Sequence, residues 1–149
     1  MVKRKTNRKR GKSISISELK NKVQAIFNEY IRLRDKNRPC ISCGEFKKLQ
    51  AGHFFPVRGY DGVRFDEFNV NGECAGCNGF NNAHLIFYAI NLKKKIGDEN
   101  FEKLIKKAVH YKKNGYKWKI DELEEKLNYY KKEVDKLKND KEEGTPETR

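Results

Sequence analysis

Two pairs of cysteines place the tightest limits on how this chain can fold. Cys40 and Cys43 form one C-x2-C pair, Cys74 and Cys77 form a second, and 30 residues lie between them. A C-x2-C turn brings two thiolates to one ion at about 2.3 Å each, and two such turns complete a tetrahedral site. Four thiolates leave no open position for water. The spacing therefore predicts a structural Zn²⁺ ion that stabilises the fold and takes no part in catalysis.

The charge balance narrows the class of partner. The chain has 149 residues with 34 Lys and Arg against 21 Asp and Glu, a formal net charge of +13. Such an excess favours polyanions, and nucleic acid is the partner we expect. No apolar run approaches the length of about 20 residues that spans a bilayer, so we expect no membrane partner. The basic N-terminus lacks the apolar segment of a secretory signal, so we expect a cytoplasmic protein. Reducing conditions there favour metal ligation over two disulfides.

Helical periodicity dominates both ends of the chain. We expect a disordered basic arm over residues 1–13 and an N-terminal helix over 14–37. Ser15 and Glu18 have the spacing of a capping box. The steps of four and three residues between the apolar positions predict one packed face. That face consists of Leu19, Val23, Ile26, Tyr30 and Leu33.

Residues 38–97 are expected to form a compact zinc-stapled module. It holds an irregular β-hairpin that turns at Asp61-Gly62 and a helix from about 80 to 96 capped by Gly97. Helices follow over 98–139, then a disordered tail over 140–149. The helix that follows Gly97 is expected to be capped by Asp98 and to end before Gly115. Its predicted buried face consists of Phe101, Leu104, Ile105, Ala108 and Val109. Residues 119–139 have a heptad pattern of apolar residues, which predicts a helix that packs on the N-terminal helix or on a second subunit. The apolar positions are Leu123, Leu127, Tyr130, Val134 and Leu137.

Several short motifs follow one another in a fixed order around the cysteines. They are "YIRLRDKNRPCISCG" (30–44), "GHFFP" (52–56), "FNVNGEC" (68–74) and "CAGCN" (74–78). Together they resemble the HNH nuclease module, whose ββα-metal fold often carries two flanking cysteine pairs. More closely they resemble the phage NinG (Rap) recombination endonucleases, over roughly residues 25 to 97. The resemblance implies an α+β fold, with a small zinc-stapled ββα-metal module flanked by N- and C-terminal helices.

The resemblance also assigns roles. His53 would be the general base, which suits a side chain that titrates near pH 6.5. Asn69 would orient His53, and Asn78 would help to hold a catalytic Mg²⁺ or another divalent ion. Many HNH modules have an Asp or His immediately before the catalytic His, but this chain has Gly52. We rank His84 first as the replacement ligand, ahead of Asp61, Asp66 and Glu67, with a surface or packing role for His84 as the alternative.

Basic and aromatic residues suggest where DNA would bind. The basic arm offers phosphate contacts from Lys3, Arg4, Lys5, Arg8, Lys9 and Arg10. Arg58 and Arg64 flank the predicted turn and are further candidates. Tyr116 and Trp118 in "GYKWK" either stack on an unpaired base or, the interpretation that we favour, pack at the joint between two helices.

The family resemblance implies a DNA endonuclease of phage or prophage recombination, active in a bacterial host on branched DNA such as Holliday junctions. Resolving a four-way junction needs two cuts, so a homodimer is expected. No small-molecule cofactor is expected. Two alternatives remain. A zinc module that only binds nucleic acid would not need the set of His53, Asn69 and Asn78. An HNH nuclease of restriction or homing type normally needs an extra domain for reading sequence.

Overall fold

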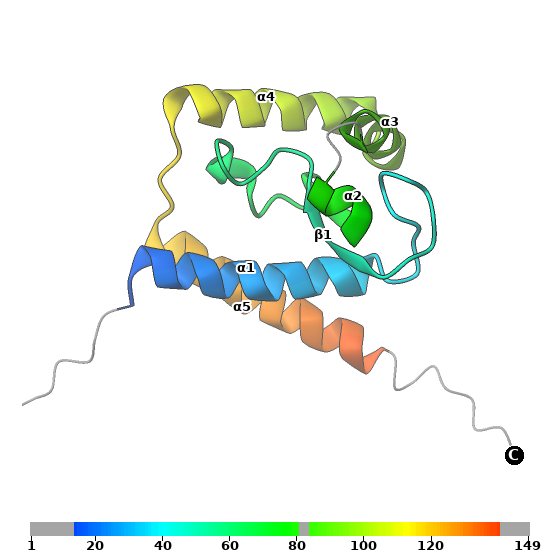
Figure 1. Cartoon of the computed structure of the whole chain (residues 1–149). Coiled ribbons are helices and arrows are strands. Elements are labelled where there is room, and N and C mark those ends of the chain that lie inside the picture. Colours follow the sequence, from blue (N-terminus) through cyan, green and yellow to red (C-terminus); the bar gives the residue numbers. More distant parts are fainter. Residues whose placement is uncertain (1–13, 81–83, 141–149) are drawn as a thin grey trace, which may run out of the picture.

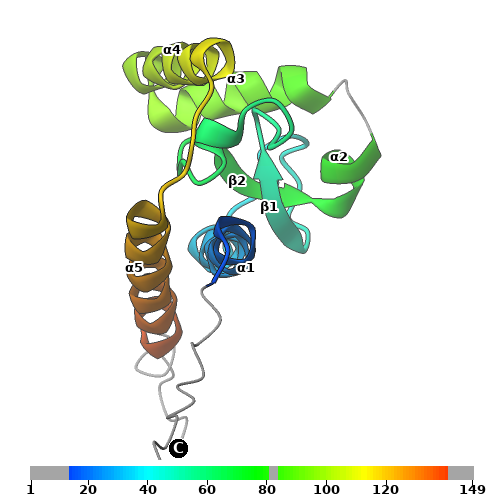
Figure 2. The same cartoon turned by 90° about the vertical axis from the view of Figure 1, so that its left-hand side faces the viewer.

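The computed structural model describes residues 14–80 and 84–140 and has the predicted α+β architecture. A two-stranded hairpin lies between a pair of helices, α1 and α5, and a second layer of helices, α3 and α4 (Figure 1 and Figure 2). The basic arm and most of the predicted tail fall outside the described residues. The elements are α1 Ile16–Arg34, β1 Leu49–His53, the 3-10 turn η1 Asp61–Val63, β2 Val70–Cys74, α2 Ala75–Phe80, α3 His84–Ile96, α4 Asp98–Asn114 and α5 Ile120–Asn139.

Helix α1 begins with the predicted capping box. The backbone N–H of Glu18 donates to Ser15 Oγ at 3.1 Å, and the backbone N–H of Ser15 donates to the Glu18 carboxylate at 2.9 Å. These bonds satisfy donors that the first helical turn cannot satisfy within itself. The capping box therefore sets the start of α1.

The buried face of α1 differs in part from the predicted one. Phe27 and Ile31 are fully buried, whereas Ile26 and Leu33 are only partly buried. The reason is that α5 and the hairpin both cover α1, so the buried face is wider than a single stripe. The buried side chains of α1 are Leu19, Val23, Phe27, Tyr30 and Ile31.

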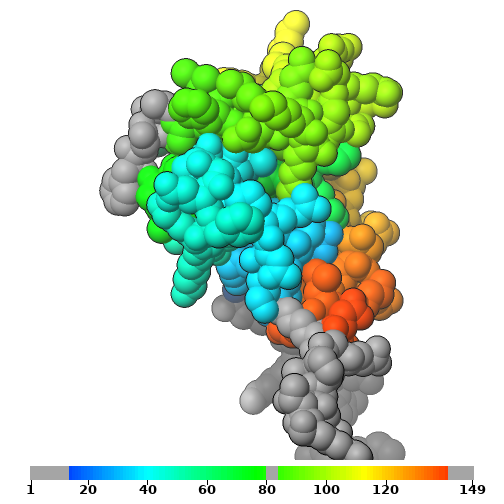
Figure 3. Space-filling model, turned by 90° about the vertical axis from the view of Figure 1, so that its right-hand side faces the viewer, coloured from blue at the N-terminus to red at the C-terminus, as the bar shows by residue number. Residues whose placement is uncertain are grey.

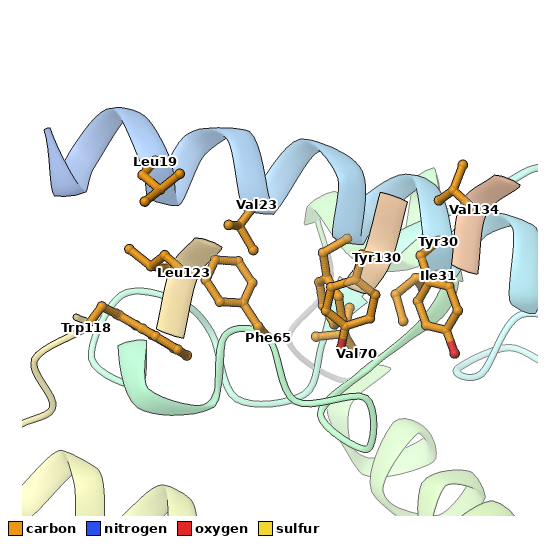
Figure 4. Close-up of a cluster of buried hydrophobic side chains, with 11 residues drawn as sticks. Leu19, Val23, Tyr30, Ile31, Phe65, Val70, Trp118, Leu123, Tyr130 and Val134 are labelled. Carbon is orange, nitrogen blue, oxygen red and sulfur yellow. The ribbon is translucent and has the colours of Figure 1, made fainter. Parts of the chain in front are cut away.

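Helix α5 packs along α1, which resolves the two alternatives for its heptad face. Leu123, Tyr130 and Val134 are buried in the core that α1 provides (Figure 4). The Tyr130 ring meets the Phe27 ring edge-on, with centroids 4.8 Å apart. This face is therefore occupied within one chain and does not offer the expected dimer interface. The homodimer itself stays a prediction.

Trp118 and Tyr116 pack at the joint between α4 and α5, as favoured above. Trp118 is 7 % exposed, and its ring centroid lies 5.1 Å from that of Phe65 and 4.8 Å from that of Tyr116. Its indole N–H donates to the Asp61 carbonyl at 3.2 Å. These contacts explain Trp118 as a packing residue.

The connection between the two strands of the hairpin is longer than predicted. Strand β1 pairs antiparallel with β2, from Leu49 opposite Cys74 to His53 opposite Val70. The predicted turn at Asp61-Gly62 is wrong, because these residues begin η1 within the long connection of residues 54–69. A Cβ on Gly62 would lie 2.5 Å from the Tyr111 ring, so this glycine permits the close approach of α4.

The helices after the second cysteine pair also depart from prediction. The helix expected from about 80 to 96 is α3, His84–Ile96, and an additional helix that was not predicted, α2, starts at Ala75 inside the second cysteine pair. Gly97 has φ 83° and separates α3 from α4, as expected of a glycine terminator. Asp98 is not the cap of α4 but its first residue. Val109 is 54 % exposed rather than inward.

Tyr88 and Leu92 of α3 and Leu104 of α4 form a second core, with Phe54 packed against it. Within the described residues no helix has both the length and the apolar character needed to cross a bilayer.

Candidate functional site: a cysteine cluster and an adjacent cleft

The four cysteines come together at one end of the hairpin. Their sulfur atoms all lie within 4.8 Å of one another, and those of Cys43 and Cys74 are 3.9 Å apart. Two thiolates at tetrahedral positions around zinc, about 2.3 Å from it, are about 3.8 Å apart. The donor set and its spacing therefore fit a tetrahedral Zn²⁺, as the sequence predicted.

Local backbone structure positions the two cysteine pairs. Gly44 has φ 73° and follows the first pair, where its N–H donates to the Cys40 carbonyl at 2.9 Å. The second pair differs, because Cys77 lies on α2 and Gly76 is an ordinary helical residue with open space around it. Only Gly44 is therefore required by its turn. The segment around the first pair lies between α3 and the end of α5 (Figure 3), and the Asn91 amide of α3 donates to the Ile41 carbonyl at 2.8 Å.

His53 ends β1 and is partly buried, with its ring orientation fixed. Its Nε2 lies 3.0 Å from the Arg64 carbonyl oxygen. A carbonyl can only accept, so Nε2 carries the proton and Nδ1 holds the free lone pair in the neutral ring. Burial lowers the pKa of His53, and the nearby Arg64 charge lowers it further, against the raising effect of the carbonyl bond. His53 is thus a neutral imidazole near pH 7 with an accepting Nδ1.

Asn69 acts on the backbone around His53. It is fully buried, and its amide donates to the carbonyls of Phe55 at 3.1 Å and Val63 at 3.0 Å. Its Oδ1 accepts from the Phe55 N–H at 2.8 Å, and its own carbonyl accepts from the Phe54 N–H at 2.9 Å. These bonds hold the chain that leaves β1. Any orientation of His53 by Asn69 would therefore act through this backbone.

A cleft of about 550 Å³ brings His53, Asn78 and His84 together along β1. Gln24 and Asn28 of α1 line its other wall. Asn78 is exposed and donates through Nδ2 to Gln50 Oε1 at 3.0 Å, which leaves Oδ1 as a possible metal donor. Residues from four separate parts of the chain thus share one cleft.

His84 is held at the base of α3 by two residues that the sequence interpretation missed. His84 Nδ1 lies 2.6 Å from Glu73 Oε1 and 3.3 Å from Ser42 Oγ. Ser42 Oγ donates to Glu73 Oε1 at 2.5 Å. Glu73 is 0 % exposed, which is unusual for a carboxylate and marks it as a specialised residue. Its position in a strand directly before a zinc cysteine was the one available signal.

Gly52 is explained by Glu73. A Cβ built on Gly52 would lie 2.3 Å from Glu73 Oε2 and 2.7 Å from Glu73 Cβ. The position before His53 is therefore glycine because the buried Glu73 side chain, from the neighbouring strand, crosses over it.

Replacing Gly52 with alanine is expected to destabilise the fold by about 1–3 kcal/mol, because Glu73 is pinned and cannot move aside cheaply. Gly79→Ala is the matched control, since nothing lies within 4 Å of that Cβ and the residue is helical. Urea unfolding midpoints would measure both. Equal midpoints for the two variants would contradict the close packing over Gly52.

The other ligand candidates are engaged elsewhere. Asp61 pairs with Lys20 at 2.7 Å and Arg64 at 2.9 Å. Asp66 pairs with Lys107 at 2.7 Å, and Glu67 accepts from Tyr30 at 2.9 Å. These acidic side chains therefore serve ion pairs and hydrogen bonds between elements.

The predicted DNA contacts divide into three cases. Arg58 is exposed beside the cleft-lining Val57. Arg64 lines the cleft but is partly buried, and it donates to Gln24 at 3.0 Å and to Asp61. The six basic residues of the N-terminal arm lie outside the described residues. Of the two described arginines, Arg58 is thus the more accessible to a DNA phosphate.

Comparison with known proteins identifies relatives. The family model for the bacteriophage lambda NinG protein matches residues 2–142. "Protein ninG" of Escherichia phage lambda is 30 % identical over 123 residues, which cover 81 % of this chain and 58 % of the relative. "Protein ninG" of Escherichia phage 933W is also 30 % identical over 123 residues, covering 81 % and 59 %.

A shorter match reaches 38 % identity over 77 residues in "Protein ninG" of Salmonella phage P22, or 50 % of this chain and 38 % of the relative. This chain thus spans less than two thirds of the length of these curated relatives. No solved structure matches it. With most of its length matched by the family model, the chain belongs to the bacteriophage lambda NinG protein family.

Proposed function

We propose that this chain is an HNH-type, metal-dependent DNA endonuclease that cuts branched recombination intermediates. The observation that carries the proposal is the cleft, where a histidine in an accepting tautomer lies with two further groups suited to a metal ion. The resemblance of the ordered motifs to phage recombination endonucleases supports branched DNA as the substrate. A module that only binds DNA has no use for a partly buried, oriented imidazole in the lining of a cleft.

His53 has the features of a general base for phosphodiester hydrolysis. Its lowered pKa keeps the ring neutral at pH 7, and Nδ1 can take a proton from the attacking water. The carbonyl of Arg64 stabilises the imidazolium that forms, because it accepts from Nε2–H throughout. Asn69 supports this arrangement because its amide holds the backbone at Phe55, two residues after His53, and at Val63, next to Arg64.

Asn78 and His84 are the residues that would hold a catalytic ion. Such an ion supplies positive charge to the scissile phosphate and to the leaving oxygen. Among the described residues, only the four cysteines form a group of three or more His, Cys, Asp or Glu ligands close enough to share one ion. An amide oxygen and an imidazole nitrogen would thus need waters and DNA phosphate oxygens to complete the coordination. This donor set accepts Mn²⁺ as well as Mg²⁺.

A direct test uses a synthetic four-way junction and a linear duplex of the same sequence, with and without Mg²⁺ or Mn²⁺. We expect metal-dependent nicking of the junction. Equal cutting of both substrates would support the nuclease assignment but indicate a general or restriction-like enzyme. Tight binding with no cutting under any of these ions would favour the non-catalytic DNA-binding alternative.

The acidic limb of the cleavage profile is expected below pH 6.5. Burial penalises the imidazolium form of His53, so its pKa is lowered and the neutral base persists as the pH falls past the ordinary value. The pH dependence of kcat/KM reports the pKa of the base in the free enzyme. A limb centred above pH 6.5 would contradict this assignment of the base.

DNA binding is expected to weaken steeply with salt. With a net charge of +13, many phosphate contacts form and release counterions. Raising NaCl from about 50 to 200 mM should lower the affinity about 10³-fold or more, as measured by fluorescence anisotropy. Arg58→Ala should reduce the salt slope by about one phosphate contact. A flat salt dependence would exclude nucleic acid as the partner.

A further inference from the structure

The buried carboxylate of Glu73 is the least expected feature near the cleft. Its Oε1 engages both Ser42 and His84, while Oε2 is buried and has no hydrogen-bond partner in the part of the chain that the structure describes. Burying a carboxylate with one oxygen unpaired costs free energy. Packing alone therefore does not explain why a glutamate occupies this buried position.

The contact with Glu73 fixes the chemical form of His84. A carboxylate can only accept, so His84 Nδ1 carries the proton, and in the neutral ring the lone pair is on Nε2. Within residues 14–80 and 84–140, Nε2 has no hydrogen-bond partner, and the ring lines the cleft. The Nε2 lone pair of His84 is therefore available to the cleft. A carboxylate on one imidazole nitrogen is the usual support for a histidine that binds a metal through the other.

The partners of His84 come from the two cysteine pairs. Ser42 lies between Cys40 and Cys43, and Glu73 immediately precedes Cys74. Gly52 leaves the space that the Glu73 side chain fills. The same two segments that carry the zinc ligands thus hold the acceptor for His84 in place. Two hydrogen-bonded side chains thus connect the segments of the cysteine cluster to the cleft.

We infer that Glu73, fixed by Ser42, is a positioning residue that presents the Nε2 lone pair of His84 to the cleft. This inference rests on the proposed nuclease function for its catalytic consequence. Its structural content, the proton position on His84, can be measured without any cleavage.

The first measurement is the tautomer of each histidine by ¹³C and ¹⁵N side-chain NMR of the zinc-loaded protein at about pH 8, above the ordinary pKa of a free imidazole. The chain has three histidines, so single replacements assign the signals. His84 should be in the Nδ1–H form. His53 should be in the Nε2–H form because of the Arg64 carbonyl, and so should His110, whose Nδ1 accepts from Asn114 at 3.1 Å. An Nε2–H form for His84 in the wild-type protein would overturn the inference.

The second measurement links Glu73 to cleavage. Glu73→Ala should shift His84 toward the Nε2–H form and lower kcat about 10–100-fold, with KM for DNA and zinc content unchanged. Glu73→Gln keeps an acceptor and should restore the Nδ1–H form and much of the rate. Glu45→Gln is the matched control, because Glu45 is an exposed acid near the same cysteine pair. Should Glu73→Ala fail to fold, Ser42→Ala removes only the supporting hydroxyl and should give a smaller change in the same direction.

The outcomes separate this inference from the proposed function. A wild-type protein that cuts no DNA refutes the nuclease, whatever the tautomer. A cleaving protein in which the tautomer of His84 changes without loss of kcat refutes the positioning role alone. Loss of zinc in step with activity would make Glu73 a purely structural residue and would also refute it.

Discussion

Cys74→Ser is expected to unfold the hairpin and the segments that carry the cysteines, and to lower the free energy of unfolding by at least several kcal/mol. Isolated two-stranded hairpins are marginal in water, and the small core at this end consists mainly of Leu49 and the cysteines themselves. Structural zinc contributes about 10–16 kcal/mol of apparent binding free energy in zinc-finger peptides, and that energy is coupled to folding. The Glu73 and Ser42 contacts that hold His84 should be lost with it.

Zinc content, near-UV circular dichroism and thermal melts with and without a chelator would measure this effect. Phe46→Ser is the matched control, because Phe46 is 76 % exposed and follows the first cysteine pair closely. It should bind one zinc per chain and melt like the wild type. A Cys74→Ser protein with an unchanged melt in the absence of zinc would refute the structural site.

His53→Ala is expected to lower the cleavage rate by about 10²–10⁴-fold, the usual contribution of a general base. DNA affinity should stay within a few-fold, because His53 is a partly buried side chain bound to the Arg64 carbonyl and carries no charge at neutral pH. Single-turnover cleavage of the junction and anisotropy binding in Ca²⁺ would separate the two effects. Zinc content should not change, since His53 is not one of the four thiolate ligands.

His110→Ala is the control for this experiment. His110 is exposed on α4 and is absent from the lining of the cleft, so its loss should leave cleavage and binding unchanged. Equal losses of cleavage and binding in His53→Ala would show that the residue shapes the DNA site and is not the base.

Features carried by short segments were predictable from the sequence. The cysteine spacing pointed to a tetrahedral site, and the sulfur atoms do converge. Ser15 and Glu18 form the predicted capping box, and Gly97 and Gly115 adopt positive φ at helix ends. The reason is that each depends on interactions within about four residues, where chain geometry leaves few alternatives.

Other features needed the tertiary structure. The sequence did not indicate α2, and it placed the turn of an irregular hairpin at Asp61-Gly62, where η1 lies within a long connection. Apolar runs do not reveal which partner will cover them. It also assigned Val109 to the core, although α4 packs through Leu104 and Ala108.

The sequence by itself determined the four-cysteine cluster and the helices near both ends of the chain, since both follow from local spacing. The order of its motifs, through the family resemblance, also identified His53 as the residue to test. Only the tertiary structure showed that Glu73 is buried, that it bonds to His84 and that it requires Gly52. Those two contacts join residues that are 11 and 21 positions apart in the chain. Their energies depend on burial, which no local pattern of residues specifies.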